Sequence, residues 1–201
     1  MTIPPAPASD MIQSLGLLDQ ERTLFSISVP AEQIPEARLT EVHRAVFAYW
    51  QAKRGQRRAP RRTEIDPCDL GFALPALILW ETDGLPDYRV RVAGTEICTN
   101  MLGELKGMLL GELRCPLLAE ARREFDAVRD HGLVSLVERT LHWLDRPLVF
   151  YRHLLLPLTD AADRIHMLLS VMTFEKTERW AGFLQNEGAR PAADRWKTEV
   201  V

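Results

Sequence analysis

The sequence predicts an α+β domain in which an antiparallel sheet carries its helices on one side. Two observations lead to this fold class. The second half of the chain ends in three consecutive apolar strand patterns, at residues 134–144, 148–158 and 165–174, which turn residues separate. The first half mixes the two kinds of pattern, in the order helix, two short strands, short helices and a longer helix.

The composition is that of a globular protein, and its 201 residues suffice for one domain with arms or for two small domains. No apolar run approaches the ~20 residues of a membrane span, and the N-terminus lacks the pattern of a signal peptide. The cysteines Cys68, Cys98 and Cys115 are far apart and fit neither a disulfide framework nor a zinc site. We therefore expect reduced thiols in a cytoplasmic protein.

The net charge of −3 argues against general nucleic-acid binding, but residues 53–62 hold six basic side chains and no acid. Such a segment is either a solvated helix end or a contact for RNA, anionic lipid or a phosphorylated ligand. Arg57 with Arg61, and Arg58 with Arg62, match the RxxxR half of a cyclic-dinucleotide motif, without a convincing second half. We expect this segment to be exposed and to make, at most, salt-sensitive contacts with an anionic partner.

The N-terminal part is expected to hold an arm and one long helix. Residues 1–34 form the partly disordered arm, with a short strand or docked extended segment at 24–29. The helix covers residues 35–54, because Pro35 suits a first helical turn and Gly55 suits a helix end.

Two short strands follow, at 76–80 and 88–93, with a turn rich in Asp, Gly and Pro between them. In the second strand Val90 and Val92 alternate with arginines, so both valines are expected to face the helices. Gly94 then permits a backbone angle that a side chain would forbid, and a short helix begins directly after it.

A longer helix covers residues 116–131, where Pro116 opens it and Gly132 ends it. The last two strands are apolar on both faces, so both faces of the sheet should be covered. The helix at 35–54 is the expected cover for one of these faces. We also expect the strand at 165–174 to pair with the strand at 76–80.

This order of elements resembles the PAS fold, and four segments match the bacterial PAS-like family often labelled PAS_5. They are AYWQAKRG, PRRTEIDPCDLGFALPALILWE, YRVRVAGTEICTNMLGELKG and LLLPLTD. The resemblance implies a five-stranded antiparallel sheet of order 2-1-5-4-3 with helices on one face and an N-terminal helix. It also implies a pocket for a small molecule or partner, and frequent dimerisation. The domain then occupies residues 35–174, and residues 175–201 form a C-terminal tail.

The expected pocket lies between the sheet and the helices. On the strand at 148–158, Arg152 occupies one face, while Tyr151 and His153 occupy the other. Because arginine is harder to bury unpaired, we place Tyr151 and His153 inward. They would then be the polar groups of an apolar small-ligand cavity, or would satisfy backbone groups in a filled core. The other predicted ligand-binding residues are Val90, Val92, Ile97, Met101, Leu102 and Phe125.

No catalytic set, metal site or cofactor can be named from the sequence. The five histidines form no HExxH motif, and neither a GxGxxG nor a Walker pattern occurs. A flavin photosensor would need an Asn-Cys-Arg setting, whereas Cys98 lies in EICTNM. A haem site would need a suitable histidine on the long helix, where His131 instead suits the helix dipole.

Three functions follow from these observations. The leading one is a sensory or regulatory PAS protein that binds a small ligand or a protein partner and signals through a dimer or partner. The alternatives are an isomerase-like or cyclase-like enzyme on a curved sheet, and a pure interaction module with a filled pocket. We expect a homodimer through residues 35–54 or the outer sheet face, because Phe47, Tyr49 and Trp50 exceed one narrow apolar stripe.

Overall fold

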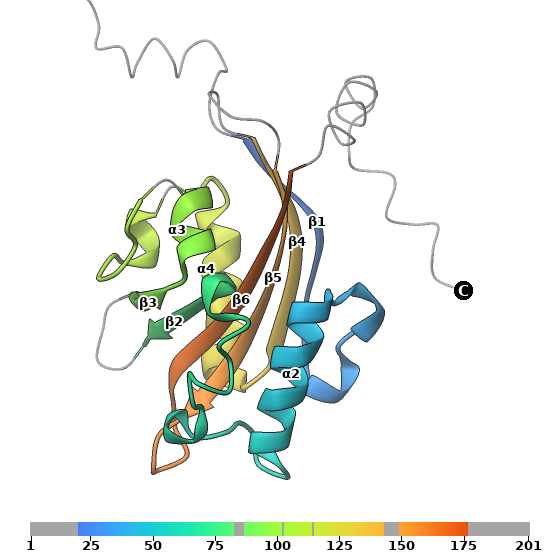
Figure 1. Ribbon diagram of the computed structural model, residues 1–201, viewed down its shortest axis with the longest axis vertical. Helices are drawn as coiled ribbons and strands as arrows, with labels where there is room; N and C mark the ends of the chain where they lie inside the picture. Colours follow the sequence, from blue (N-terminus) through green and yellow to red (C-terminus); the bar gives the residue numbers. More distant parts are fainter. Residues whose placement is uncertain (1–19, 83–86, 102, 114, 143–148, 177–201) are drawn as a thin grey trace, which may run out of the picture.

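The computed structural model describes residues 20–82, 87–101, 103–113, 115–142 and 149–176. Its centre is one twisted antiparallel sheet of six strands in the order β1-β4-β5-β6-β2-β3 (Figure 1). The strands are β1 Gln20–Val29, β2 Leu77–Glu81, β3 Arg89–Ala93, β4 Val134–His142, β5 Val149–Thr159 and β6 Ile165–Lys176. Helix α2 (Glu41–Arg54) covers one face, and helices α3 (Thr95–Met101) and α4 (Leu118–His131) cover the other.

Strands β2 to β6 confirm the predicted sheet. Taken alone, they have the order β3-β2-β6-β5-β4, and β2 pairs antiparallel with β3 on one side and β6 on the other. The additional strand β1 pairs with β4, with Gln20 opposite His142 and Val29 opposite Val134. The sheet therefore has one strand more than predicted, and that strand comes from the segment assigned to the N-terminal arm.

Helix α2 begins at Glu41 rather than at Pro35. Residues Glu36–Arg38 form a separate 3-10 turn, η2. Thr40 caps the helix, since its side-chain oxygen accepts a 3.4 Å hydrogen bond from the backbone N–H of His43. The predicted end is confirmed: Gly55 follows the helix with φ of 57°, a backbone angle that favours glycine.

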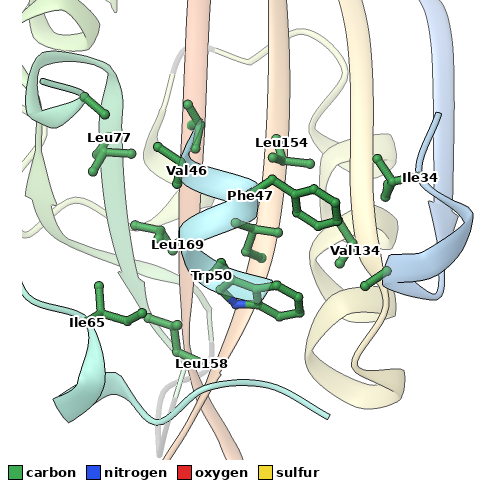
Figure 2. Close-up of a cluster of buried hydrophobic side chains, with 14 of the residues drawn as sticks. Ile34, Val46, Phe47, Trp50, Ile65, Leu77, Val134, Leu154, Leu158 and Leu169 are labelled. Carbon is green, nitrogen blue, oxygen red and sulfur yellow. The ribbon is translucent and has the colours of Figure 1, made fainter. Parts of the chain in front are cut away.

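The helix α2 buries its aromatic side chains against the sheet (Figure 2). Trp50 is completely buried, and its indole N–H donates a 2.9 Å hydrogen bond to the carbonyl oxygen of Pro157. Phe47 is 2% exposed and stacks on Trp50 with ring centroids 6.0 Å apart. Phe47 and Trp50 therefore do not support the predicted dimer interface on this helix, because these two rings fill the chain's own core.

A β-bulge in β3 separates the two valines that were predicted to share a face. Leu79 lies opposite Val92 while Trp80 lies opposite Val90, so Arg91 is an extra residue between two paired ones. One extra residue inverts the alternation of side chains along a strand. Val90 is accordingly 1% exposed, whereas Val92 is 57% exposed and lies on the side of Leu79.

Gly94 is required for a different reason from the one predicted. A Cβ atom at this position would lie 2.2 Å from the carbonyl oxygens of both Leu74 and Pro75. Glycine therefore allows the segment before β2 to pass directly over the start of α3. The close approach of two backbones, rather than an unusual backbone angle, fixes this residue.

Three of the six basic side chains in the segment 53–62 form ion pairs with acidic side chains of the same chain. Arg54 pairs with Glu32, Arg57 with Glu64 at 2.8 Å, and Lys53 with Asp69 at 3.6 Å. The arginines of the two RxxxR pairs therefore contact different partners within the chain. Arg58 donates a 3.0 Å hydrogen bond to the backbone of Asp130, and Arg62 donates one of 3.1 Å to the backbone of Ile65.

Candidate functional site

A small cavity lies between the sheet and the helices α3 and α4, on the face predicted to hold the pocket. Its volume is about 60 Å³. Apolar side chains form most of its wall, among them Ile78, Met101, Leu105, Phe125 and Leu141. Polar side chains enter it from three strands: Glu21 from β1, Arg139 from β4, and Tyr151 and His153 from β5.

The carboxylate of Glu21 is the centre of a buried hydrogen-bond network. It accepts a hydrogen bond from the Tyr151 hydroxyl and another, of 3.1 Å, from the backbone N–H of Leu117. The Arg139 guanidinium lies 4.0 Å away, and the two charged side chains are only 3% and 2% exposed. An arginine is rarely buried to this extent unless it is paired, so Glu21 and Arg139 stabilise each other's burial.

Arg139 also binds a second buried carboxylate. Its guanidinium lies 2.7 Å from Glu124 of α4 and donates a 3.0 Å hydrogen bond to Thr23 of β1. Ser26 donates another hydrogen bond of 3.0 Å to the same oxygen of Glu124. Burial raises the pKa of Glu124, and the positive charge of Arg139 opposes that rise. Arg139 therefore joins β1, β4 and α4 through one charge.

His153 belongs to a second, neutral network. The Trp80 indole N–H donates a 2.8 Å hydrogen bond to the hydroxyl oxygen of Ser170, which lies 2.8 Å from Nε2 of His153. Because Ser170 accepts from Trp80, its own hydrogen is free to donate to His153. Burial lowers the pKa of His153 to about 3, with smaller contributions from the charge of Arg139 and from His43. The imidazole is therefore neutral at physiological pH.

The structure brings most of the predicted site residues together. Val90, Ile97, Phe125, Tyr151 and His153 are buried on the face that α3 and α4 cover, and Met101 is half-buried beside the cavity there. The prediction that Val92 faces this cavity is wrong, because the bulge turns its side chain to the opposite side of the sheet. Leu102 lies outside the described residues.

Glu21, Arg139 and Glu124 were missed because each reads as a surface residue in its own segment. On β4, Arg139 follows Glu138, so one of two adjacent charged side chains had to face inward. That alternation was the one available signal. The partners that make Arg139 a buried residue come from distant segments, and neither is visible in the pattern of β4 itself.

The chemistry of these groups suits binding and positioning better than proton transfer. Burial raises the pKa of Tyr151 well above its usual range, and burial beside Glu21 raises the pKa of Cys115 to about 12. General acid–base catalysis works best with a pKa near the operating pH. The neutral His153 is a weak base by the same criterion. The described residues contain no group of three or more His, Cys, Asp or Glu side chains placed to hold a metal ion.

The two buried histidines predict a pH-dependent stability. Burial lowers the pKa of His43 to about 4 and that of His153 to about 3, whereas an unfolded histidine titrates near pH 6.5. Between these limits the unfolded chain binds more protons than the folded chain. Above pH 6.5 the two histidines therefore leave the free energy of unfolding unchanged. Below that value the free energy of unfolding falls with pH, by up to roughly 2.7 kcal/mol per pH unit for the two groups together.

Urea unfolding at intervals from pH 7.5 to pH 5 measures this slope above the range in which most carboxylates titrate. Glu124 contributes with the opposite sign, because its raised pKa favours the folded state as the pH falls. A His153→Gln variant removes one of the two titrating groups and should show about half the slope of the wild type. A variant slope equal to that of the wild type would contradict the assignment.

The family model described as PAS_5, a PAS domain, matches residues 39–173. A comparison with curated protein sequences finds no match. Within the described residues, no helix has the length and apolar character that crossing a bilayer requires.

Solved structures of similar fold include several light-oxygen-voltage domains. One, studied with a flavin analogue, is 17% identical over 59% of this chain and 90% of its own, with a TM-score of 0.44. The light state of the blue-light photoreceptor Aureochrome1 LOV is 19% identical over 59% and 94%, with a TM-score of 0.43. An RNA-binding light-oxygen-voltage receptor is 13% identical over 90% of this chain and 49% of its own, with a TM-score of 0.45.

Proposed function

Since this chain belongs to the PAS_5 family of PAS domains, we propose that it is a sensory or regulatory protein whose input is a small ligand in the inner cavity and whose output is a protein contact. The output partner is either a second copy of the chain or another signalling protein. We place the protein in the cytoplasm, a location that its three free cysteines favour.

One observation carries this proposal: four polar side chains converge on an otherwise apolar cavity, which is the usual design of a small-ligand site. Pockets for drug-sized ligands have volumes of roughly 300 to 1,000 Å³. The cavity of about 60 Å³ is far smaller, so the described form suits water or a ligand of a few heavy atoms. A larger ligand would require α3, α4 or β1 to move away from the sheet.

The position of Glu21 suggests how occupancy of the cavity reaches the surface. Glu21 belongs to β1, one of the two edge strands, and its carboxylate is held by Tyr151 and approached by Arg139 inside the cavity. A ligand that competes for Tyr151 or Arg139 therefore changes how firmly β1 is held against β4. This supports a binding and signalling role, and the raised or lowered pKa values of the cavity residues favour such a role over catalysis.

Native mass spectrometry of gently purified protein tests the input. We expect the wild type to retain a small molecule. A Tyr151→Phe/His153→Leu variant should lose that molecule although its melting temperature shows that it still folds. The Tyr88→Phe variant is a matched control. Tyr88 is also buried and donates a 2.5 Å hydrogen bond to a carboxylate, that of Asp126, but it does not line the cavity.

Retention should survive in the control. A clean ligand-free mass for the wild type, together with a melting temperature that a library of small ligands leaves unchanged, would overturn the proposed ligand input. The protein would then be a pure interaction module whose core is filled by its own side chains.

A further inference from the structure

A second and larger hollow lies on the opposite side of the sheet from the inner cavity. It is a groove of about 550 Å³ between the segment that precedes β2 and the strands β2, β3 and β6. Leu77 and Leu79 of β2 and Leu169 of β6 contribute to it from the sheet. In Figure 2, Leu77, Leu169 and Ile65 lie at the margin of the core that α2 covers. The groove therefore continues an apolar face beyond the reach of that helix.

The groove has an apolar lining, and two of its large side chains are well exposed to solvent. Leu74 is 44% exposed on one wall, and Val92, which the bulge turned to this side, is 57% exposed on the other. Pro67 and Pro75 add further exposed apolar surface, whereas Ile65 and Leu70 are buried beneath it. Large side chains exposed together in this way mark a surface that binds something apolar.

One charged side chain lines the groove. Arg62 donates a hydrogen bond to the backbone of Ile65 and makes no ion pair with the described residues. Its neighbours in the basic segment, Arg54 and Arg57, are each paired with a glutamate. The planar guanidinium of Arg62 thus keeps donors available for an anion, and no acidic side chain lines the groove to compete with that anion.

We propose that this groove binds a single-tailed anionic amphiphile, with its aliphatic tail on Leu74, Leu79 and Val92 and its anionic head at Arg62. The volume lies within the range of small-molecule sites, which favours a small amphiphile over a partner helix that would need a longer surface. The close contact of Gly94 with the backbone of Leu74 and Pro75 fixes the two walls relative to each other. The site is therefore preformed and separate from the inner cavity.

Isothermal titration calorimetry with hexanoate, octanoate and decanoate, below their micelle concentrations, tests the tail. Each buried methylene should tighten binding by up to about fourfold, the equivalent of ~0.8 kcal/mol. Affinity that ignores chain length would overturn the proposal. Decyl phosphate and decyl sulfate test whether the head must be a carboxylate. Both should bind as decanoate does if Arg62 supplies charge alone.

Substitutions test the head and the walls separately. Arg62→Ala should weaken decanoate binding about fivefold, as an exposed ion pair predicts, and should leave decanol binding unchanged. Arg61→Ala is the matched control, because Arg61 is exposed beside it but does not line the groove. Equal losses in both variants would contradict a specific head site.

For the walls, Leu74→Ser and Val92→Ser should each weaken decanoate binding roughly fivefold. Phe72→Ser is their control, since Phe72 is 59% exposed in the same segment and does not line the groove. An equal loss in the Phe72 variant, or a concentration-dependent dimer that decanoate fails to dissociate, would indicate a broader protein-docking surface and overturn the proposal. All five substituted positions, including Arg61 and Arg62, are at least partly exposed, so these variants should fold.

Discussion

Replacing Arg139 by methionine should destabilise the protein by about 3 to 5 kcal/mol at neutral pH, the typical loss when one partner of a buried ion pair is removed. Methionine keeps the aliphatic volume of the arginine stem but removes the charge that Glu21 and Glu124 share. Two buried carboxylates would then remain without a positive charge beside them. Urea unfolding at pH 7.5 measures the loss directly.

The pH dependence identifies the cause. Without Arg139 the Glu124 carboxyl loses the positive charge that opposes the burial-driven rise of its pKa, so the variant recovers stability relative to the wild type as the pH falls toward 5. Adding Glu21→Gln and Glu124→Gln to the variant should restore much of the loss at pH 7.5. Arg164→Met is the matched control, because that arginine is 71% exposed in its ion pair with Asp160 and should change stability by less than ~1 kcal/mol. A loss for Arg139→Met that is independent of pH would point to packing instead.

Trp50→Ala is expected to be the other severe variant, with a loss of about 3 to 5 kcal/mol. The indole is completely buried under α2, contacts Phe47, and is hydrogen-bonded to Pro157 of β5. Alanine leaves a cavity at the centre of the face that Figure 2 shows, and it also leaves the Pro157 carbonyl unpaired. Thermal and urea unfolding followed by circular dichroism measure the change.

A milder substitution separates the two contributions. Trp50→Phe retains most of the ring volume but loses the indole N–H, and it should cost about 1 to 3 kcal/mol through the buried carbonyl alone. Phe72→Ala is the surface control and should lie within ~0.5 kcal/mol of the wild type. Comparable losses for Phe72→Ala and Trp50→Ala would mean that the apolar face under α2 does not hold the fold together.

Much of the fold could be predicted from local pattern. The strands β2, β5 and β6 are apolar runs bounded by turn residues, and their pairing followed from the family resemblance. Gly55 and Gly132 marked the ends of α2 and α4 because each has a positive φ that other residues rarely adopt, 57° and 64° respectively.

The errors arose where a distant segment decides the outcome. The side of Val92 depends on the bulge opposite Leu79 and Trp80, and alternation within one strand cannot reveal an inserted residue. The inward position of Tyr151 could be argued from its neighbour Arg152. The burial of Arg139 could not, because its partner Glu21 lies in a segment that reads as an arm.

The pairing of β1 with β4 has a consequence for how the chain is made. Glu21 leaves the ribosome well before Arg139, and synthesis at ~5 to 20 residues per second separates the two by roughly 6 to 24 s. During that interval the alternating apolar residues of β1, Phe25, Ile27 and Val29, have no β4 to join. The first strand of the sheet to be synthesised is thus paired only after β4 has emerged, and a nascent chain halted before residue 134 exposes an unpaired apolar strand to chaperones.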